Sequence, residues 1–201
     1  MRKTYIYSNF KKPIMKKYFL IALMAIFTFQ VDTLIAQETP QNGPNFPKID
    51  ASPMDLAIYR DANEEALARV IYSRPQKRDR EVFGKLVPYG QVWRTGANEA
   101  TELTLYKDMT VADATVKAGT YTVYTIPEEK EWTVILNKRI HTWGAYEYTD
   151  KEDLVRIKVP VRQSPTTIEA FSIAFSPKDN GADLLMGWDN KYVEVPFKVA
   201  R

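Results

Sequence analysis

The feature that most constrains this chain is the strict alternation of apolar and polar residues along several short segments. Residues 192–199, with the sequence YVEVPFKV, place apolar side chains at every second position. Residues 154–160 and 169–175 alternate in the same way. A period of two puts the apolar side chains on one face of a β-strand, and that face must pack against another layer. The alternation therefore predicts half-buried strands.

Turn residues between such segments predict hairpins and a sandwich. Residues 121–126 and 131–136 flank a turn at 127–130, and Asp189-Asn190 separates two strand-like runs as a second predicted hairpin. Residues 61–70, DANEEALARV, are the best helical candidate, although short. We expect an all-β, antiparallel sandwich of about nine or ten strands, with immunoglobulin-like and jelly-roll topologies both open. Further strands are expected near residues 54–60, 66–73, 101–107, 110–116 and 182–188.

The N-terminal segment has the order of a secretory signal. A short basic start, Met15-Lys16-Lys17, precedes the apolar residues 18–29, and Ala36 is a small residue at the expected cut. This order predicts a signal peptide over residues 1–36, with Met15 as an alternative start. The apolar run is shorter than the roughly 20 residues that span a bilayer. We therefore expect an exported protein, periplasmic or extracellular, with no membrane span after cleavage.

Composition limits the partners of the exported part. Residues 37–50 contain three prolines and no apolar periodicity, which predicts a flexible leader before a single domain at residues 51–201. The chain has 28 basic and 25 acidic residues; residues 1–36 hold six and one of these, so the remainder has 22 and 24, a net charge of −2. This balance gives no reason to expect nucleic acid.

The sequence lacks the residues that several kinds of catalysis and metal binding require. The sequence contains no cysteine, so we expect no disulfide, no thiolate chemistry and no lipoprotein anchor, which needs a cysteine at the cleavage point. His141 is the only histidine and lies in a loop-like segment, where a surface role is expected. A lone histidine predicts neither a serine triad nor an imidazole-rich metal site, and we expect no metal and no cofactor.

Long motifs resemble a known family. The motifs are IYSRPQKRDREVFGKLVPYGQVWRTGANEATELTL at residues 71–105, KAGTYTVYTIPEEKEWTVILNK at 117–138, WGAYEY at 143–148 and DLVRIKV at 153–159. They resemble domain-of-unknown-function family 2911, and the similarity runs from about residue 51 to residue 199. The resemblance implies an exported bacterial protein and brings no reaction or ligand with it.

Candidate ligand-binding residues cluster in the motif at residues 88–101. In a scaffold interpretation, Arg94 and Glu99 form an ion pair that holds the loop, and Trp93 plugs the end of the sandwich. In a binding interpretation, Arg94, Asn98 and Glu99 face an open concavity beside Trp93, and Arg74 joins Arg94 to receive an acidic group. Both interpretations stay open.

Trp143 is the remaining candidate. It lies beside a glycine in a second loop-like segment, and it either caps the sandwich or offers a face on which a sugar ring stacks. By contrast, Trp132 and Trp188 lie in alternating segments and are expected in the core.

The residues favour a noncatalytic ligand-binding or interaction module of the cell envelope, with a small molecule or carbohydrate as ligand. The alternative is a hydrolase that cleaves polysaccharide with a pair of carboxylates, of which Glu99 is one candidate.

Overall fold

The computed structural model describes residues 43–200. The expected signal segment, residues 1–36, and the first part of the expected leader lie outside the described residues. Residues 43–50 are exposed and contain neither helix nor strand. Every strand described below lies in one compact unit, which begins at Lys48.

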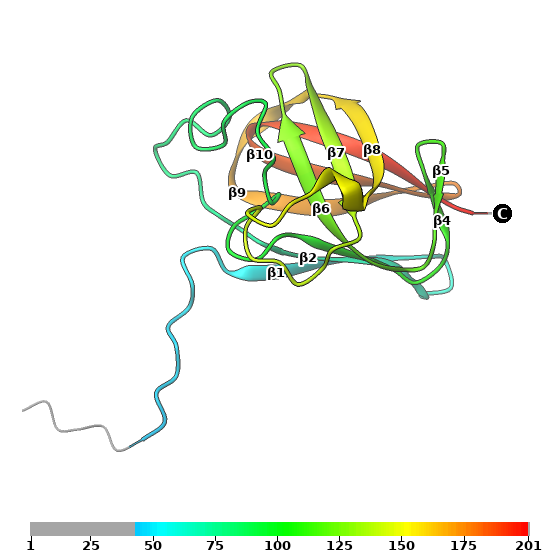
Figure 1. The fold of residues 1–201 in the computed structure, drawn as a ribbon, viewed down its shortest axis with the longest axis horizontal. Helices are drawn as coiled ribbons and strands as arrows, with labels where there is room; N and C mark the ends of the chain where they lie inside the picture. The colour runs from blue at the N-terminus through cyan, green and yellow to red at the C-terminus, as the bar shows by residue number, and fades with distance from the viewer. Residues whose placement is uncertain (1–42, 201) are drawn as a thin grey trace, which may run out of the picture. The chain divides into compact units, whose positions relative to one another are not determined.

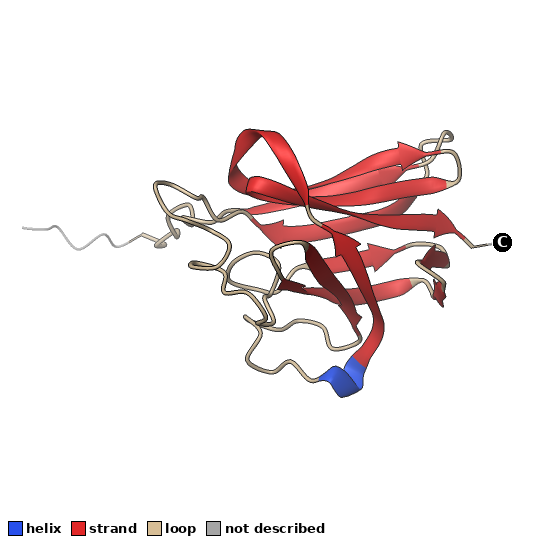
Figure 2. Ribbon diagram, turned by 90° about the horizontal axis from the view of Figure 1, so that it is seen from above, coloured by secondary structure: helices blue, strands red, loops and turns tan. Residues whose placement is uncertain are grey.

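The predicted antiparallel β-sandwich is confirmed. The described residues form ten strands in two antiparallel sheets, one of six strands and one of four, which pack face to face (Figures 1 and 2). The strands are β1 (Met54–Arg60), β2 (Ala66–Ser73), β3 (Glu102–Leu105), β4 (Met109–Val111), β5 (Ala114–Val116), β6 (Gly119–Pro127), β7 (Glu131–Asn137), β8 (Asp153–Pro160), β9 (Arg162–Lys178) and β10 (Gly181–Val199). One short 3-10 helix, η1 (Asp150–Glu152), precedes β8.

The two longest loops between strands lie at the same end of the sandwich. The six-stranded sheet has the order β1-β2-β3-β6-β7-β8, and the four-stranded sheet has the order β5-β4-β10-β9. Residues 74–101 connect β2 to β3, and residues 138–149 connect β7 to η1. Figure 2 shows the long loops gathered at one end of the sandwich, with the C-terminus at the other end.

Most predicted strands occur where the alternation placed them. The predicted hairpin at residues 121–136 is present, with β6 paired to β7 from Thr122↔Asn137 to Pro127↔Trp132. The predicted short strand near 110–116 is a hairpin of two three-residue strands, β4 and β5. The helical candidate at residues 61–70 is wrong: residues 61–65 turn, and β2 follows from Ala66.

The second predicted hairpin, at Asp189-Asn190, is also wrong. β10 continues through these residues, and its pairing with β9 shifts register on both sides of Asp189. Asp189 has a φ of 58°, so the chain kinks at a bulge without reversing. Turn-forming residues inside a strand therefore mark a bulge here.

The main core lies between the sheets and contains the expected tryptophans. Trp132 on β7 and Trp188 on β10 are 0 % and 2 % exposed. A second, smaller core lies on the outer face of the six-stranded sheet. Val123 packs in the main core, so its neighbour Tyr124 points to the opposite face, where it is fully buried with Ile135 and Ala100. The two long loops therefore cover β6 and β7 from outside.

Candidate functional site

Trp93 is the centre of an aromatic cluster that joins the two sheets. Its ring centroid lies 6.3 Å from that of Trp132, 6.0 Å from that of Trp188 and 5.1 Å from that of Phe171. The indole Nε1 donates a hydrogen bond to the carbonyl of Gly96 at 3.0 Å. Trp93 is 8 % exposed, so it plugs the sandwich, as the scaffold interpretation predicted, and is not an open platform.

Buried threonines attach the motif at residues 88–101 to β6. The backbone of Trp93 exchanges two hydrogen bonds with Thr125, at 2.7 and 3.0 Å. The hydroxyl of Thr95 donates to the hydroxyl of Thr125 at 3.1 Å, and the hydroxyl of Thr101 donates to the carbonyl of Thr95 at 2.5 Å. All three threonines are fully buried. The loop is therefore held by buried hydrogen bonds and a fixed path of the chain.

The predicted ion pair between Arg94 and Glu99 does not form. Within residues 43–200, neither side chain takes part in an ion pair. Between them, Thr95, Gly96 and Asn98 have φ values of 56°, 157° and 57°. These positive φ angles turn the chain so that Arg94 and Glu99 line two different cavities.

The first cavity surrounds Arg94 and has a volume of about 310 Å³. Among the described residues, its polar lining consists of Ser52, Arg80, Arg94 and Asn98, with no aspartate or glutamate. The apolar walls are Pro75, Leu86, Val87, Trp93, Ala97 and Trp188. Three residues of the predicted site, Trp93, Arg94 and Asn98, therefore meet in one cavity.

Arg94 lacks partners in this cavity. Its Nε is buried and has no hydrogen-bond partner among the described residues. By contrast, Arg80 donates to the carbonyls of Gln76 and Lys77. Asn98 Nδ2 donates a hydrogen bond to Asp50 Oδ1 at 3.1 Å. An unpaired guanidinium with five donors is suited to a carboxylate or another planar anion.

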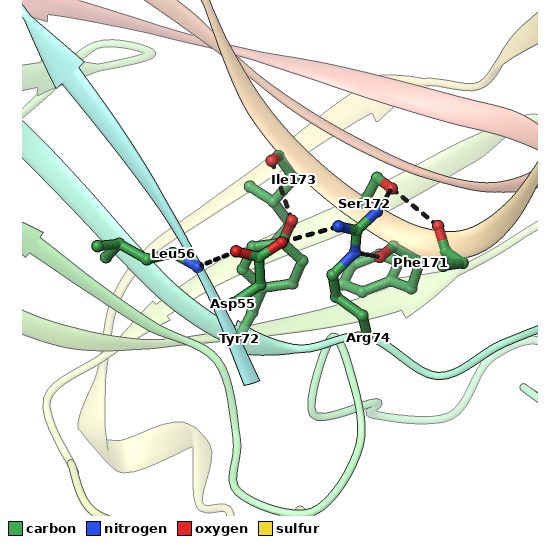
Figure 3. A network of polar contacts seen from close by, with 8 residues as sticks. Asp55, Leu56, Tyr72, Arg74, Phe171, Ser172 and Ile173 are labelled. Atoms are coloured by element: carbon green, nitrogen blue, oxygen red, sulfur yellow. Dashed lines mark hydrogen bonds and ion pairs between the residues drawn. The ribbon is translucent and has the colours of Figure 1, made fainter. Parts of the chain in front are cut away.

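Arg74 does not join Arg94, because its guanidinium is already occupied. It donates to Asp55 on β1 at 2.8 Å, to the carbonyl of Phe171 at 3.2 Å and to Ser172 Oγ at 2.9 Å (Figure 3). Figure 3 shows the guanidinium between the edge of one sheet and β9 of the other. Arg74 therefore fastens the two sheets together.

The second cavity, of about 300 Å³, holds Glu99, Glu102 and His141. His141 Nδ1 lies 3.3 Å from Glu102 Oε1, which also accepts a 2.7 Å hydrogen bond from the backbone N–H of His141. The His141 side chain is 77 % exposed, in agreement with the predicted surface role, and its φ is 60°. Met54 and Ile71 contribute apolar walls. Sequence reasoning missed this grouping, because 39 residues separate Glu102 from His141 and neither carries a local signal.

Trp143 lies outside both cavities. It is 59 % exposed, and its ring stacks on that of Tyr146, which is 80 % exposed. An isolated antiparallel bridge pairs Trp143 with Glu99, so the loop that carries the aromatic rings lies beside the motif at residues 88–101.

In two larger hollows, part of the charged lining is already paired. In the first, of about 640 Å³, Lys158 pairs with Glu131 at 2.5 Å. In the second, of about 560 Å³, Lys107 pairs with Glu65 at 2.7 Å and Lys178 with Asp183 at 3.3 Å. We place the candidate site at Arg94, because its Nε is buried and has no hydrogen-bond partner among residues 43–200.

Within residues 43–200, no group of three or more histidine, aspartate or glutamate side chains is placed to hold a metal ion. No helix among these residues has the length and apolar character needed to cross a bilayer.

The comparison with protein families agrees with the resemblance of the motifs. Residues 52–197 match the family described as protein of unknown function (DUF2911), and this match covers most of the chain. The chain belongs to this family. Both cavities of this DUF2911 domain lie within the matched residues, since Ser52 is the first residue of either lining and Trp188 the last. No curated protein and no solved structure matches the chain.

Proposed function

We propose that this DUF2911 domain is an exported, noncatalytic ligand-binding module of the cell envelope that receives the carboxylate of a small molecule at Arg94. The single observation that carries the proposal is that, among residues 43–200, the buried Nε of Arg94 has no hydrogen-bond partner and no acidic residue lines its cavity. Export is supported by the signal-like order of residues 15–36.

The physical argument starts from the cost of the unpaired donor. A buried donor without a partner costs roughly 1–3 kcal/mol, and a ligand that accepts its hydrogen bond removes that cost. The apolar walls suit a ligand with an apolar body, because a small-molecule site combines apolar contact with a few placed polar groups. The cavity therefore fits an organic acid, such as a uronic acid or an aromatic acid.

The test compares matched acids and neutral analogues. We expect glucuronate, galacturonate and benzoate to raise the melting temperature and to bind in titration calorimetry, and glucose, galactose and benzyl alcohol to do neither. The Arg94→Met variant is expected to bind the acids at least about tenfold more weakly, because a charge-assisted hydrogen bond is worth about 1.5–3 kcal/mol. Arg60→Met removes an exposed arginine elsewhere and is the matched control.

Two outcomes would contradict the proposal. One is equal binding of the acids by wild type and Arg94→Met. The other is that no acid in the panel stabilises the protein more than its neutral analogue.

A carboxylate-dependent hydrolase is the second candidate, and one observation favours it. Glu99 and Glu102 line the same cavity, and glycoside hydrolysis needs two carboxylates across the scissile bond. In this mechanism one carboxyl protonates the leaving oxygen while the other attacks the sugar or activates water. The test is hydrolysis of nitrophenyl glycosides and reduced polysaccharides. Activity that is lost in both Glu99→Gln and Glu102→Gln would support this candidate, and no activity on any substrate would contradict it.

A further inference from the structure

Two aromatic rings are exposed together on the loop at residues 138–149. Trp143 is 59 % exposed and Tyr146 is 80 % exposed. Their centroids are 5.7 Å apart and their planes differ by 8°, so the rings are stacked. An exposed, stacked pair of this kind presents the outer faces of its rings, an apolar surface, to solvent.

The fold does not need these rings to hold the loop. The hydroxyls of Thr142 and Tyr124 share a buried hydrogen bond of 2.9 Å. The backbone N–H of Gly144 donates to the carbonyl of Asn98 at 2.9 Å. Tyr148 packs against the outer core around Tyr124. These contacts of Thr142, Gly144 and Tyr148 hold the loop on both sides of the pair. The two rings therefore remain available for contact with another molecule.

Gly144 sets the position of Tyr146. Its φ is 70°, and a Cβ added to it would lie 2.8 Å from two carbons of the Tyr146 ring. The ring therefore lies directly against the backbone of the glycine. A ring held in this way loses little conformational freedom when a ligand binds, which favours affinity.

The surroundings of the pair are polar. Trp143 forms a β-bridge with Glu99, an exposed carboxylate that takes part in no ion pair within residues 43–200. Arg139 and Glu147, also exposed, form an ion pair on the same loop. The two rings can bury at most about 500 Å² together, whereas a standard protein interface buries about 800 Å² on each partner. A small aromatic face on a polar loop suits a ligand with one apolar face and many hydroxyls.

We propose that Trp143 and Tyr146 form a platform that binds the apolar C–H face of a neutral pyranose within an oligosaccharide. Glu99 accepts hydrogen bonds from the hydroxyls of the sugar, since an ionised carboxylate has about four acceptor positions. This platform is independent of the Arg94 cavity, because Trp143 and Tyr146 do not line it.

The experiment measures binding of the full chain to neutral cello-, manno-, xylo- and laminari-oligosaccharides by titration calorimetry and affinity electrophoresis. We expect at least one of them to bind, and Trp143→Ala and Tyr146→Ala to weaken that binding about tenfold or more. Trp143→Phe retains an aromatic face and is expected to lose less affinity than Trp143→Ala. Tyr106→Ala removes another exposed aromatic side chain and should leave binding unchanged.

Three outcomes would overturn the proposal. The first is that none of the four oligosaccharide series binds. The second is binding that Trp143→Ala and Tyr146→Ala leave unchanged. The third is a dimer in sedimentation experiments that dissociates in Trp143→Ala, because the rings would then be covered by a second copy of the chain. Circular dichroism of each variant separates loss of binding from loss of the fold.

Discussion

Arg74 and Asp55 join the first strand to the opposite sheet through a half-exposed ion pair. Asp55 also accepts a hydrogen bond of 2.7 Å from the backbone N–H of Leu56. This backbone hydrogen bond is the main cause that lowers the pKa of Asp55 below 3.8, and Arg74 adds to it. The native fold therefore favours the ionised form of the carboxyl.

The lowered pKa predicts a dependence of stability on pH. A carboxyl whose pKa is lower in the folded than in the unfolded state stabilises the fold above its unfolded pKa of about 3.9, and that contribution disappears as the pH falls through the folded pKa. We expect the free energy of unfolding to fall less steeply with decreasing pH in Asp55→Asn than in the wild type. Urea unfolding from about pH 6 to about pH 3 measures this slope. Asp113→Asn, at an exposed turn, is the control, and identical slopes for wild type and Asp55→Asn would refute the expectation.

The burial of Trp93 and the exposure of Trp143 predict different effects of alanine substitution on stability. Trp93 is buried between the sheets, so Trp93→Ala is expected to cost about 3–5 kcal/mol. Trp143 is mostly exposed, so Trp143→Ala is expected to cost less than about 1 kcal/mol. Denaturant unfolding of both variants measures the difference. Similar costs would show that the exposed ring also supports the fold.

Local sequence could not separate these two tryptophans. Each follows a loop-like stretch and lies near a glycine. The difference arises from a long-range contact, because the backbone of Trp93 pairs with Thr125 on β6 and so directs the ring into the core. The same limit applies to Arg94 and Glu99. Their separation of five positions suggested a pair, but three positive φ angles between them direct the side chains to different cavities.

At the scale of elements, alternation predicted strands well where one face is buried. β8 follows its predicted range closely, because its buried Val155 and Val159 alternate with exposed lysine and arginine. The sequence pattern wrongly predicted two strands within β10, and the positions of its buried residues explain this error. Up to Trp188 the buried side chains of Ala182, Leu184, Met186 and Trp188 are at even-numbered positions, whereas those of Val193, Val195 and Phe197 are at odd-numbered positions. A bulge and a hairpin both interrupt alternation, and only the pairing with β9 distinguishes them.

The bulge in β10 predicts the effect of a deletion. Removing Asn190 would put the buried residues of β10 in one continuous alternation and delete the extra residue that the kink at Asp189 requires, so the pairing with β9 beyond Asp189 would have to change register. We expect this deletion to abolish cooperative folding, whereas Asn190→Ala, at an exposed position, should change stability by less than about 0.5 kcal/mol. Near-ultraviolet circular dichroism and thermal unfolding of both variants test this. A deletion variant that unfolds like the wild type would contradict the proposed role of the bulge.

At the scale of the whole molecule, one loop serves both the core and the candidate site. The motif at residues 88–101 places Trp93 between the sheets, Arg94 in a cavity without acids and Glu99 beside an exposed aromatic pair. The main core holds this loop through Trp93, so the positions of the two candidate ligand sites depend on the packing of the sandwich. Variants at Arg94 and Trp143 can therefore be tested without disturbing that core, whereas variants at Trp93 cannot.

Export is the remaining property of the whole chain that we predict. Basic residues at the beginning of a signal, here Lys16 and Lys17, favour an N-terminus that stays on the cytoplasmic side of the membrane. The apolar residues 18–29 that follow are typical of an export signal. We expect the full chain made in a Gram-negative host to be recovered outside the cytoplasm with a mass that corresponds to a start at Gln37. Acidic substitution of Lys16 and Lys17 should reduce export. Because the chain contains no cysteine, its folding needs no oxidising compartment, so a variant that starts at Gln37 should fold equally well in the cytoplasm. A full-length product confined to the cytoplasm would show that residues 1–36 are not an export signal.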